Sequence, residues 1–478
     1  MSESIDISRI VVAQQVLDLI PAQLARRFEI LPLRRENDVL WLVCSDPDNL
    51  AAVRQVENIT GLTLQLLTPQ HVAALRQAIR RFYPENLGGD NAAGLLQRIV
   101  NRALQLRASD IHLAPDADGG LIQLRIDGRL VPDMRLSSES CQELISVIKI
   151  QSRLDIAEKR TPLDGGMSLA LPGETVDMRV ATIPTIHGEH VTMRLLSQDN
   201  LDHLEALDKL GFSPVHYRLL LEALAEPNGI ILLSGPTGSG KTTTLYAALR
   251  YLRQSGARHL VSVEDPVEKP LEGVTQVKID ADNERVTFNK ALRSILRHDP
   301  DVIMIGEIRD GETGDIAVKA ALTGHLVLST LHTNSAAGVL TRLVNLGLAP
   351  FLVASTMRLA IAQRLVRRPC PYCVSYRTPT AEECRTFGWH QDEDIRVPVA
   401  NGCSYCGGRG YSGRCAIYEI IPVDREIRHL IMQQADDRAL AEHAYNQLKL
   451  PSMRGDGADK IRRGMTTVEE VGMACGGI

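Results

Sequence analysis

The alternation of apolar and polar residues divides the chain into stretches of different character. Strand-like and helix-like patterns alternate up to residue 83. Residues 39–49 have the pattern of an apolar strand that runs into a turn, and 71–82 have the spacing of an amphipathic helix. A stretch rich in Pro, Gly and Asn follows at 84–92 and predicts a linker. We therefore expect a small N-terminal domain over residues 1–85.

A second domain is expected over residues 92–200. It opens with a helical pattern at 93–106. Strand patterns follow, and the turn pair Asp127–Gly128 interrupts the earliest of them. These strand-like stretches are 122–130, 175–185 and 189–196. The pattern predicts an α+β domain, which we expect to be PAS-like.

From about residue 211 the pattern changes to short strands that are apolar on both faces, separated by helical segments. The apolar stretches lie at 229–235, 259–264, 301–307 and 325–331. Strands of this kind are typical of a mostly parallel sheet with helices covering both faces. The sequence therefore predicts an α/β fold for residues 211–478, after two smaller α+β domains.

A glycine-rich phosphate-binding motif lies between the first of these strands and a helical segment. It reads GPTGSGKT and fits the pattern G-x-x-x-x-G-K-[ST] in the strand-to-helix context that the pattern requires. Backbone N–H groups of such a loop surround phosphates beside a helix N-terminus. Lys241 is expected to neutralise the β- and γ-phosphates, and Thr242 to bind Mg²⁺. The residues predicted to bind nucleotide are Gly235, Pro236, Thr237, Gly238, Ser239, Gly240, Lys241, Thr242 and Thr243.

The strand at 302–305 is followed by Gly306 and Glu307, where many P-loop ATPases have an aspartate before the glutamate to help hold Mg²⁺. Ligands of parallel sheets bind beyond the carboxyl ends of the strands, so Glu307 is expected beside the phosphate loop, where it can activate water. Asp301 is at the opposite end of its strand, too distant to replace the aspartate.

An acidic loop is the better source of the negative charge that an aspartate before Glu307 would supply near Mg²⁺. Glu264, Asp265 and Glu268 follow another apolar strand and are expected on the same rim. His332 follows a further strand and is a candidate sensor of the γ-phosphate. His325 begins that same strand, which favours a scaffold role for it.

Four of the nine cysteines form two C-x-x-C pairs, Cys370 with Cys373 and Cys403 with Cys406. Two such pairs suit a closed tetrahedral Zn²⁺ site, which is structural because no position is left for water. A redox pair is an alternative, and a zinc ribbon that binds nucleic acid is another. Cys384 and Cys415 lie close enough in sequence to confuse the ligand assignment.

Composition excludes some classes of protein. The 478 residues carry a net charge of −5 and only 4 % aromatic residues, so we expect no nucleic-acid partner. The first ten residues do not resemble a secretory signal, and no run reaches the ~18 apolar residues that span a bilayer. We therefore expect a cytoplasmic protein.

Taken together, the motifs resemble those of the secretion ATPase superfamily, and within it the type II secretion and type IV pilus assembly ATPases. The segments that carry this resemblance are GPTGSGKTTTLYAAL, VEDPVE, ILRHDPDVIMIGEIRDGET, TGHLVLSTLHTN and IAQRLVRRPCPYC. The resemblance implies a RecA-like ATPase domain with a zinc element at 367–416 and a helical C-terminal region at 417–478. It also implies that Gly306 before the catalytic Glu307 is ordinary in this family.

Further expectations come from the resemblance alone. It assigns Glu264, Asp265 and Glu268 to an aspartate box and His325 and His332 to a histidine box. Arg179 and Arg194 occupy positions from which family members reach the nucleotide across a domain or subunit boundary. An arginine on a second rigid body can couple phosphate charge to domain motion.

The resemblance also implies a setting. It predicts a homo-hexamer that uses ATP, Mg²⁺ and Zn²⁺, docked through residues 11–83 on the cytoplasmic domain of an inner-membrane assembly-platform protein. An acidic lipid surface is a further expected contact, so the protein would lie in the cytoplasm against the bacterial inner membrane. The RLG-type repeat with which some relatives bind a cyclic dinucleotide is not found.

The sequence is compatible with three functions. The first is an ATPase motor that drives assembly of a type II secretion pseudopilus, with type IV pilus assembly as its close alternative. The second is a DNA-handling ATPase of the conjugation type, which the acidic charge and scarce aromatics disfavour. The third is an ATP-binding switch without turnover, supported only by the absent aspartate.

Overall fold

The computed structural model describes residues 4–5, 12, 14–47, 49–69, 71–83, 91–171, 174–196, 206–256, 258–279, 286–390, 394–403 and 405–476. The predicted linker at 84–92 lies almost entirely outside these ranges. The chain forms two compact units. One comprises residues 1–199, 370–375 and 400–413, and the other comprises 200–369, 376–399 and 414–478. The predicted domain boundaries remain predictions.

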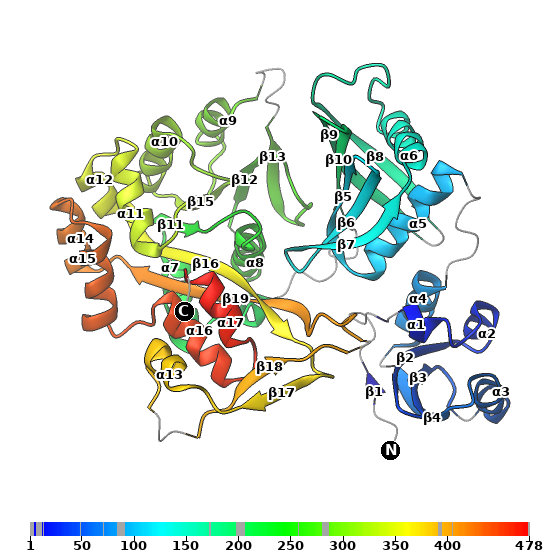
Figure 1. Ribbon diagram of the computed structural model, residues 1–478. Helices are drawn as coiled ribbons and strands as arrows, with labels where there is room; N and C mark the ends of the chain where they lie inside the picture. Colours follow the sequence, from blue (N-terminus) through cyan, green and yellow to red (C-terminus); the bar gives the residue numbers. More distant parts are fainter. Residues whose placement is uncertain are drawn as a thin grey trace. The chain divides into compact units, whose positions relative to one another are not determined.

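The first unit opens with a four-stranded sheet in the order β1-β4-β3-β2 (Figure 1). Its elements are β1 (Ser4–Ile5), α1 (Gln14–Leu17), α2 (Ala22–Arg27), β2 (Ile30–Glu36), β3 (Val39–Cys44), α3 (Leu50–Thr60), β4 (Thr63–Pro69) and α4 (Val72–Phe82). The amphipathic helix predicted at 71–82 is therefore confirmed as α4.

An antiparallel six-stranded sheet follows, in the order β7-β6-β5-β10-β9-β8. Asp127 and Gly128 both have positive φ, as the predicted turn between β6 and β7 requires. Buried apolar residues of α5, α6 and the strands form a core of their own. The elements are α5 (Ala92–Gln105), β5 (Ala108–Asp116), β6 (Gly119–Ile126), β7 (Arg129–Leu136), α6 (Ser138–Gln151), β8 (Leu163–Leu171), β9 (Glu174–Thr185) and β10 (Gly188–Leu196).

The second unit is built on a seven-stranded sheet in the order β13-β12-β14-β15-β11-β16-β19 (Figure 1). The six strands β13, β12, β14, β15, β11 and β16 pair in parallel in that order. The strands of this sheet are β11 (Gly229–Ser234), β12 (Leu260–Glu264), β13 (Val274–Lys278), β14 (Val302–Ile305), β15 (Leu326–Leu331), β16 (Met357–Pro369) and β19 (Tyr411–Pro422). The predicted α/β class is confirmed.

Successive residues of the central strands enter different cores, because side chains of a strand alternate between its two faces. Ile230 and Leu232 pack with residues of α9, α10, α11, α12, α14 and α15. Ile231 and Leu233 pack on the opposite face, with residues of α7 and α8. Both faces are therefore buried, which explains why these strands are continuously apolar in sequence.

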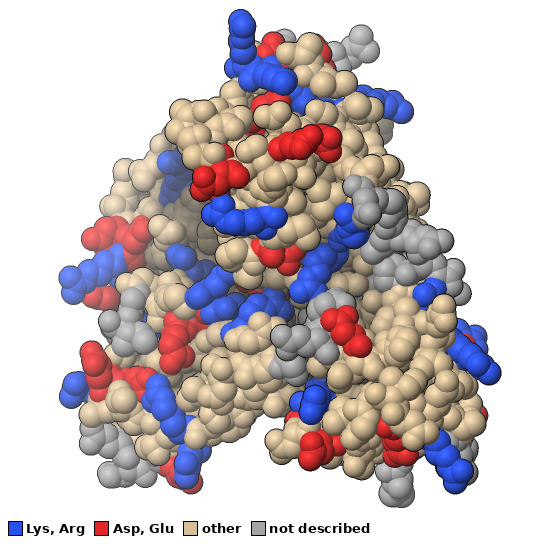
Figure 2. All heavy atoms as spheres, turned by 45° about the vertical axis from the view of Figure 1, so that its right-hand side comes forward, with Lys and Arg blue, Asp and Glu red and all other residues tan. Residues whose placement is uncertain are grey.

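The other elements after residue 200 are η2 (Leu207–Lys209), α7 (Pro214–Ala225), α8 (Lys241–Gln254), α9 (Phe288–Ile295), α10 (Gly311–Leu322), α11 (Ala336–Asn345), α12 (Pro350–Thr356), β17 (Val374–Arg377), α13 (Ala381–Phe387), β18 (Val397–Ala400), α14 (Arg425–Met432), α15 (Asp437–Glu442), η3 (His443–Gln447), α16 (Met453–Arg462) and α17 (Val468–Ala474). Strands β17 and β18 pair as a separate two-stranded sheet. Within the described ranges, no helix combines the length and apolar character needed to cross a bilayer. Both acidic and basic side chains occur on the face drawn in Figure 2.

Truncating a central core residue should destabilise the second unit far more than truncating an exposed one. Leu328 in β15 is 0 % exposed, whereas Leu322 in α10 is 50 % exposed. Leu328→Ala should lower the free energy of unfolding by about 2–5 kcal/mol through lost burial and a cavity, and Leu322→Ala should have little effect. Urea denaturation measures both. Equal losses would contradict the packing described.

Candidate nucleotide site and tetracysteine cluster

Backbone pairing in the seven-stranded sheet sets the ends of four strands at one level. Val263 in β12 pairs with Ile305 in β14, and Ile305 pairs with Ser329 in β15. Ser329 pairs in turn with Leu232 in β11. Because these strands are parallel, the segments that follow them leave the sheet at the same edge. The glycine-rich loop, the acidic loop and Glu307 therefore share one rim, as predicted.

The glycine-rich loop turns sharply from β11 into α8. Gly235, Gly238 and Gly240 have φ values of 145°, 76° and 86°, a region that residues with a Cβ rarely adopt. The helix begins at Lys241, whose Nζ donates to the carbonyl oxygens of Gly235 at 2.7 Å and Pro236 at 3.1 Å. The lysine thus lies against the loop to which it belongs.

Two further observations concern the start of α8. Thr242 and Thr243 are exposed there, so their hydroxyls are accessible to a ligand at the helix N-terminus. Burial lowers the pKa of the Lys241 ammonium, while attraction to Glu307 acts in the opposite direction. The negative charge of Glu307 thus acts on the Lys241 ammonium at this rim.

The structure gives a steric reason for glycine at position 306. Its N–H donates to the carbonyl oxygen of Val263 at 2.8 Å. A Cβ at position 306 would lie only 3.3 Å from that same oxygen. An aspartate here would press on the neighbouring strand, so the close approach of β14 to β12 favours glycine.

Glu307 is held by two basic groups. Its carboxylate accepts a hydrogen bond from Arg309, and the Nε2 atom of His332 lies 3.5 Å from its other oxygen. The bond from Arg309 is the largest influence on the pKa of Glu307 and lowers it, against an opposing effect of burial. Glu307 is therefore ionised at neutral pH, as a residue that activates water must be.

The acidic loop divides into a buried and an exposed part. Glu264 is 3 % exposed, and its carboxylate accepts hydrogen bonds from Tyr246, from Ser262 at 2.6 Å and from Gln276 at 3.0 Å. Asp265 and Glu268 are exposed. Both oxygens of Glu264 thus bind protein groups, and the accessible negative charge of this loop comes from the other two carboxylates.

Other predicted residues lie at the opposite end of the strands. His325 precedes β15, and its Nδ1 contacts the carbonyl oxygen of Ala320 at 2.8 Å at the end of α10. Asp301 precedes β14 and accepts a bond from the backbone N–H of His259 at 2.6 Å. Their positions agree with the scaffold role predicted for His325 and with the exclusion of Asp301 from the metal site.

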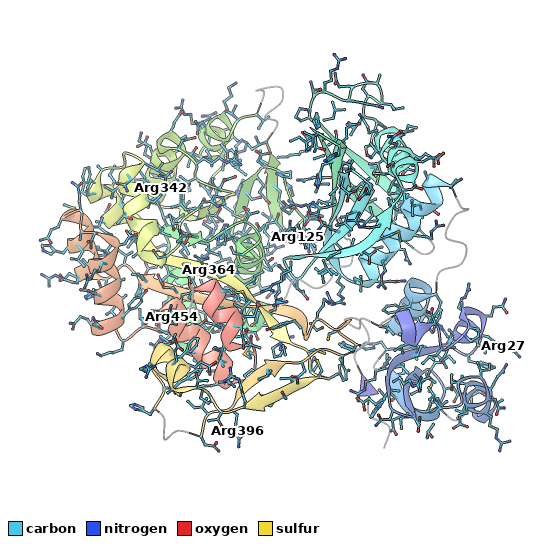
Figure 3. The ribbon with its side chains drawn as sticks, viewed as in Figure 1. Arg27, Arg125, Arg342, Arg364, Arg396 and Arg454 are labelled. Carbon is cyan, nitrogen blue, oxygen red and sulfur yellow. The ribbon has the colours of Figure 1, made fainter. Side chains whose placement is uncertain are left out.

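Arg179 and Arg194 belong to the first unit and are register partners in β9 and β10. Both are exposed. The Nε of Arg194 donates to Asp110 at 2.8 Å, and Arg125, labelled in Figure 3, lies 3.5 Å from the same carboxylate. Burial raises the pKa of Asp110, but the bond from Arg194 and other contacts bring it below its usual value. The role of these arginines toward a nucleotide remains a prediction.

The two C-x-x-C pairs converge in the first unit. The four sulfur atoms all lie within 4.8 Å of one another. Sγ–Sγ distances are 3.9 Å for Cys370 and Cys403, 3.9 Å for Cys373 and Cys406, and 3.8 Å for Cys403 and Cys406. A tetrahedral metal about 2.3 Å from each sulfur would set them about 3.8 Å apart, so the spacing fits Zn²⁺.

The backbone supports this cluster. The N–H groups of Gly402 and Gly410 donate to the sulfurs of Cys373 and Cys406, at 3.2 Å and 3.1 Å. The other two candidate thiols lie elsewhere. Cys384 packs in a separate apolar core, and the Cys415 thiol donates to the carbonyl oxygen of Met465 at 3.6 Å. The candidate metal ligands are therefore Cys370, Cys373, Cys403 and Cys406, and neither Cys384 nor Cys415 belongs to the cluster.

Sequence reasoning missed three residues that shape the site. Arg309 could have been found from the sequence, because a basic residue two positions after Glu307 is close enough to lower the pKa of that carboxylate. Tyr246 and Gln276, which hold Glu264, gave no signal. They reach Glu264 only because α8 and β13 pack beside β12.

The contact between Arg309 and Glu307 predicts a change in pH dependence. Replacing Arg309 with Met removes the largest cause of the lowered pKa, so the pKa of Glu307 should rise. The acid limb of the pH–kcat profile for ATP hydrolysis should then move to higher pH, because Glu307 protonates earlier as the pH falls. Arg218→Met is the control, since Arg218 and its partner Glu222, 3.7 Å away on the same helix α7, are both exposed. An unmoved acid limb would count against Glu307 as the titrating base.

Comparison with known families agrees with the motifs. The family described as "Type II/IV secretion system protein" matches residues 88–473. The family described as "MshEN domain" matches residues 2–89.

Several relatives are similar over most of the chain. "Type II secretion system protein E" of Pseudomonas aeruginosa is 41 % identical, over 95 % of each chain. "Type II secretion system ATPase E" of Vibrio cholerae is 44 % identical over 79 % of this chain and 74 % of the relative. "Type IV pilus assembly ATPase PilB" of Myxococcus xanthus is 38 % identical over 96 % of this chain and 86 % of the relative.

Solved structures confirm the fold. The pilus retraction motor PilT with bound ADP matches with a TM-score of 0.52 and 27 % identity, over 79 % of this chain and 96 % of that one. The ATPase DotB of Legionella pneumophila matches with a TM-score of 0.58 over 82 % of this chain and 97 % of its own, at 23 % identity. The family match covers most of the chain and agrees with the P-loop, Glu307 and the parallel sheet. The chain therefore belongs to the type II/IV secretion system protein family.

Proposed function

We propose that this protein is an ATPase motor that drives assembly of a type II secretion pseudopilus and so powers protein export. The observation that carries the proposal is the strand register of the parallel sheet, which sets the glycine-rich loop with Lys241, the acidic loop and Glu307 on one rim. The relatives named for type II secretion, which match along nearly the whole chain, supply the biological setting.

Each group at the rim has a separate role in the proposed hydrolysis of ATP. The glycine-rich loop and Lys241 bind the phosphates, and Thr242 supplies a hydroxyl ligand for Mg²⁺. Glu307 orients and deprotonates the attacking water, and His332 beside it senses the γ-phosphate. Asp265 and Glu268 supply the negative charge near Mg²⁺ that an aspartate at position 306 would otherwise give.

Type IV pilus assembly is the second candidate function. Relatives named as type IV pilus assembly ATPases are 37 % and 38 % identical over 95 % and 96 % of this chain. Assembly of a pilus and of a pseudopilus would use the same ATP chemistry. We favour type II secretion because its relatives reach higher identity, up to 46 % over 79 % of the chain.

The assembly we propose is a homo-hexamer on the cytoplasmic face of the inner membrane. The N-terminal domain would dock on the cytoplasmic part of an assembly-platform protein, next to acidic lipid. Arg179 and Arg194 are suited to reach phosphate charge across a domain or subunit boundary, because both are exposed on one face of a rigid sheet. Light scattering of the purified chain with and without ATP would test the hexamer.

Steady-state ATP hydrolysis tests the proposed activity. The full chain would be assayed alone, with single-stranded DNA, and with acidic vesicles plus the cytoplasmic domain of a candidate inner-membrane partner. Vesicles and partner should stimulate turnover. Lys241→Ala should abolish it by removing phosphate binding, and Glu307→Gln should lower kcat by roughly 10²–10⁴-fold while ATP still binds.

The alternatives give different results in the same assay. Stimulation by DNA with a steep salt dependence would indicate a DNA-handling ATPase instead. ATP binding without turnover under every condition would indicate a nucleotide-dependent switch. Full activity in Glu307→Gln would show that another group activates the water.

We further propose that the four clustered cysteines bind one structural Zn²⁺ per chain. Cys403→Ser should abolish bound zinc and lower the thermal midpoint, because metal binding at a closed site stabilises the folded state. Cys384→Ala should keep its zinc, since that thiol lies in a different core. Elemental analysis with a melting curve measures both effects, and zinc retained by Cys403→Ser would refute the site.

A further inference from the structure

One polar side chain of β16 is buried beneath the glycine-rich loop, directly after the apolar residues 359–362. Gln363 is 2 % exposed. It follows Ala362, the last residue of β16 that pairs with β11, and therefore lies beside Gly235. A Cβ at Gly235 would come within 2.3 Å of the Gln363 carbonyl oxygen, so the loop starts in direct contact with this strand.

The side-chain amide of Gln363 joins two parts of the nucleotide motif. Its Nε2 donates to the carbonyl oxygen of Ser239 in the loop at 2.8 Å. Its Oε1 accepts from the hydroxyl of Thr244 in the first turns of α8, also at 2.8 Å. Ser239 and Thr244 are 3 % and 2 % exposed. A carbonyl can only accept, so Nε2 must face Ser239, and the orientation of the amide is determined.

Gly240 makes this arrangement possible. A Cβ at position 240 would lie 2.8 Å from the Nε2 atom of Gln363. Any other residue here would displace the amide from the loop. The glycine therefore permits the contact with Gln363 as well as the positive φ that precedes α8.

The bond to Ser239 has a consequence for the phosphate side of the loop. A trans peptide is planar, and its C=O and N–H groups point in opposite directions. Holding the Ser239 carbonyl toward Gln363 therefore directs the Gly240 N–H away from β16. Loop N–H groups with a fixed direction are what a P-loop uses to bind phosphate.

We propose that Gln363 is a positioning residue that orients the Ser239–Gly240 peptide for binding of the nucleotide phosphates. The inference rests on the proposed ATPase function and assigns Gln363 a role within that site. Glutamine is suited to the task because one amide donates to Ser239 and accepts from Thr244 at once. The next residue, Arg364, labelled on β16 in Figure 3, instead bonds Asn334 at 3.3 Å.

The test compares the full-length wild type with Gln363→Met, Thr244→Val and Thr244→Ser. Methionine keeps the side-chain volume but removes both hydrogen bonds. A fluorescent ADP analogue reports Kd, and steady-state assays report KM and kcat for ATP. Gln363→Met should raise Kd and KM roughly tenfold, as expected for the loss of two hydrogen bonds, with kcat little changed. Thr244→Ser, which keeps the hydroxyl, should bind like the wild type.

Coupling between the two side chains distinguishes positioning from simple packing. Thr244→Val should weaken nucleotide binding, and the double variant should lose less than the sum of the two single losses. The control is Thr356→Val, which removes a partly buried 2.7 Å bond from the Thr356 hydroxyl to the carbonyl oxygen of Leu352. Thr356 directly precedes β16, at the end of the β11–β16 pairing that is farther from Gln363. This variant should lower stability without changing Kd.

The outcomes are separable. If the wild type binds no nucleotide, the proposed function fails, and the inference fails with it. If the wild type binds but Gln363→Met has the same Kd and KM, or if the two losses are additive, Gln363 is only a packing residue. If Gln363→Met does not fold, the difference between Thr244→Val and Thr244→Ser decides the question.

Discussion

The nucleotide site depends on the parallel pairing of β11, β15, β14 and β12. This pairing places Leu232, Ser329, Ile305 and Val263 at one level, so the functional segments that follow these strands emerge together. A shift of one strand by a single residue would exchange its two faces and move its loop away from the rim. The apolar cores on the two faces of the sheet fix this register. They therefore determine which polar groups lie together at its edge.

At that rim, the close packing of two strands determines where a carboxylate can be placed. The approach of β14 to β12 sets a Cβ at position 306 only 3.3 Å from the carbonyl oxygen of Val263, which favours glycine over an aspartate there. The carboxylate comes one residue later, at Glu307, where Arg309 and His332 keep it ionised. The same basic groups draw the carboxylate toward themselves.

Glu264 and Gln363 illustrate what a linear pattern can and cannot predict. The position of Glu264 at a strand end followed from the sequence, and its approach to the rim is confirmed. Its engagement with Tyr246, Ser262 and Gln276 did not follow, because two of these residues come from other elements. Nothing in the sequence around Gln363, which is followed directly by Arg364, distinguishes it from the other polar residues of β16. Its importance depends on β16 lying next to β11, which no local pattern specifies.

The sequence by itself determined the α/β class, the phosphate-binding loop, the position of Glu307 after its strand, the two C-x-x-C pairs and the family. These features depend on local periodicity and on short motifs whose chemistry is contained within a few residues. The tertiary structure alone decided which carboxylates remain accessible, which thiols converge and which buried amide supports the loop. Those outcomes depend on strand order and on side-chain direction across the sheet, where residues more than a hundred positions apart become neighbours, as Gln363 and Thr244 do.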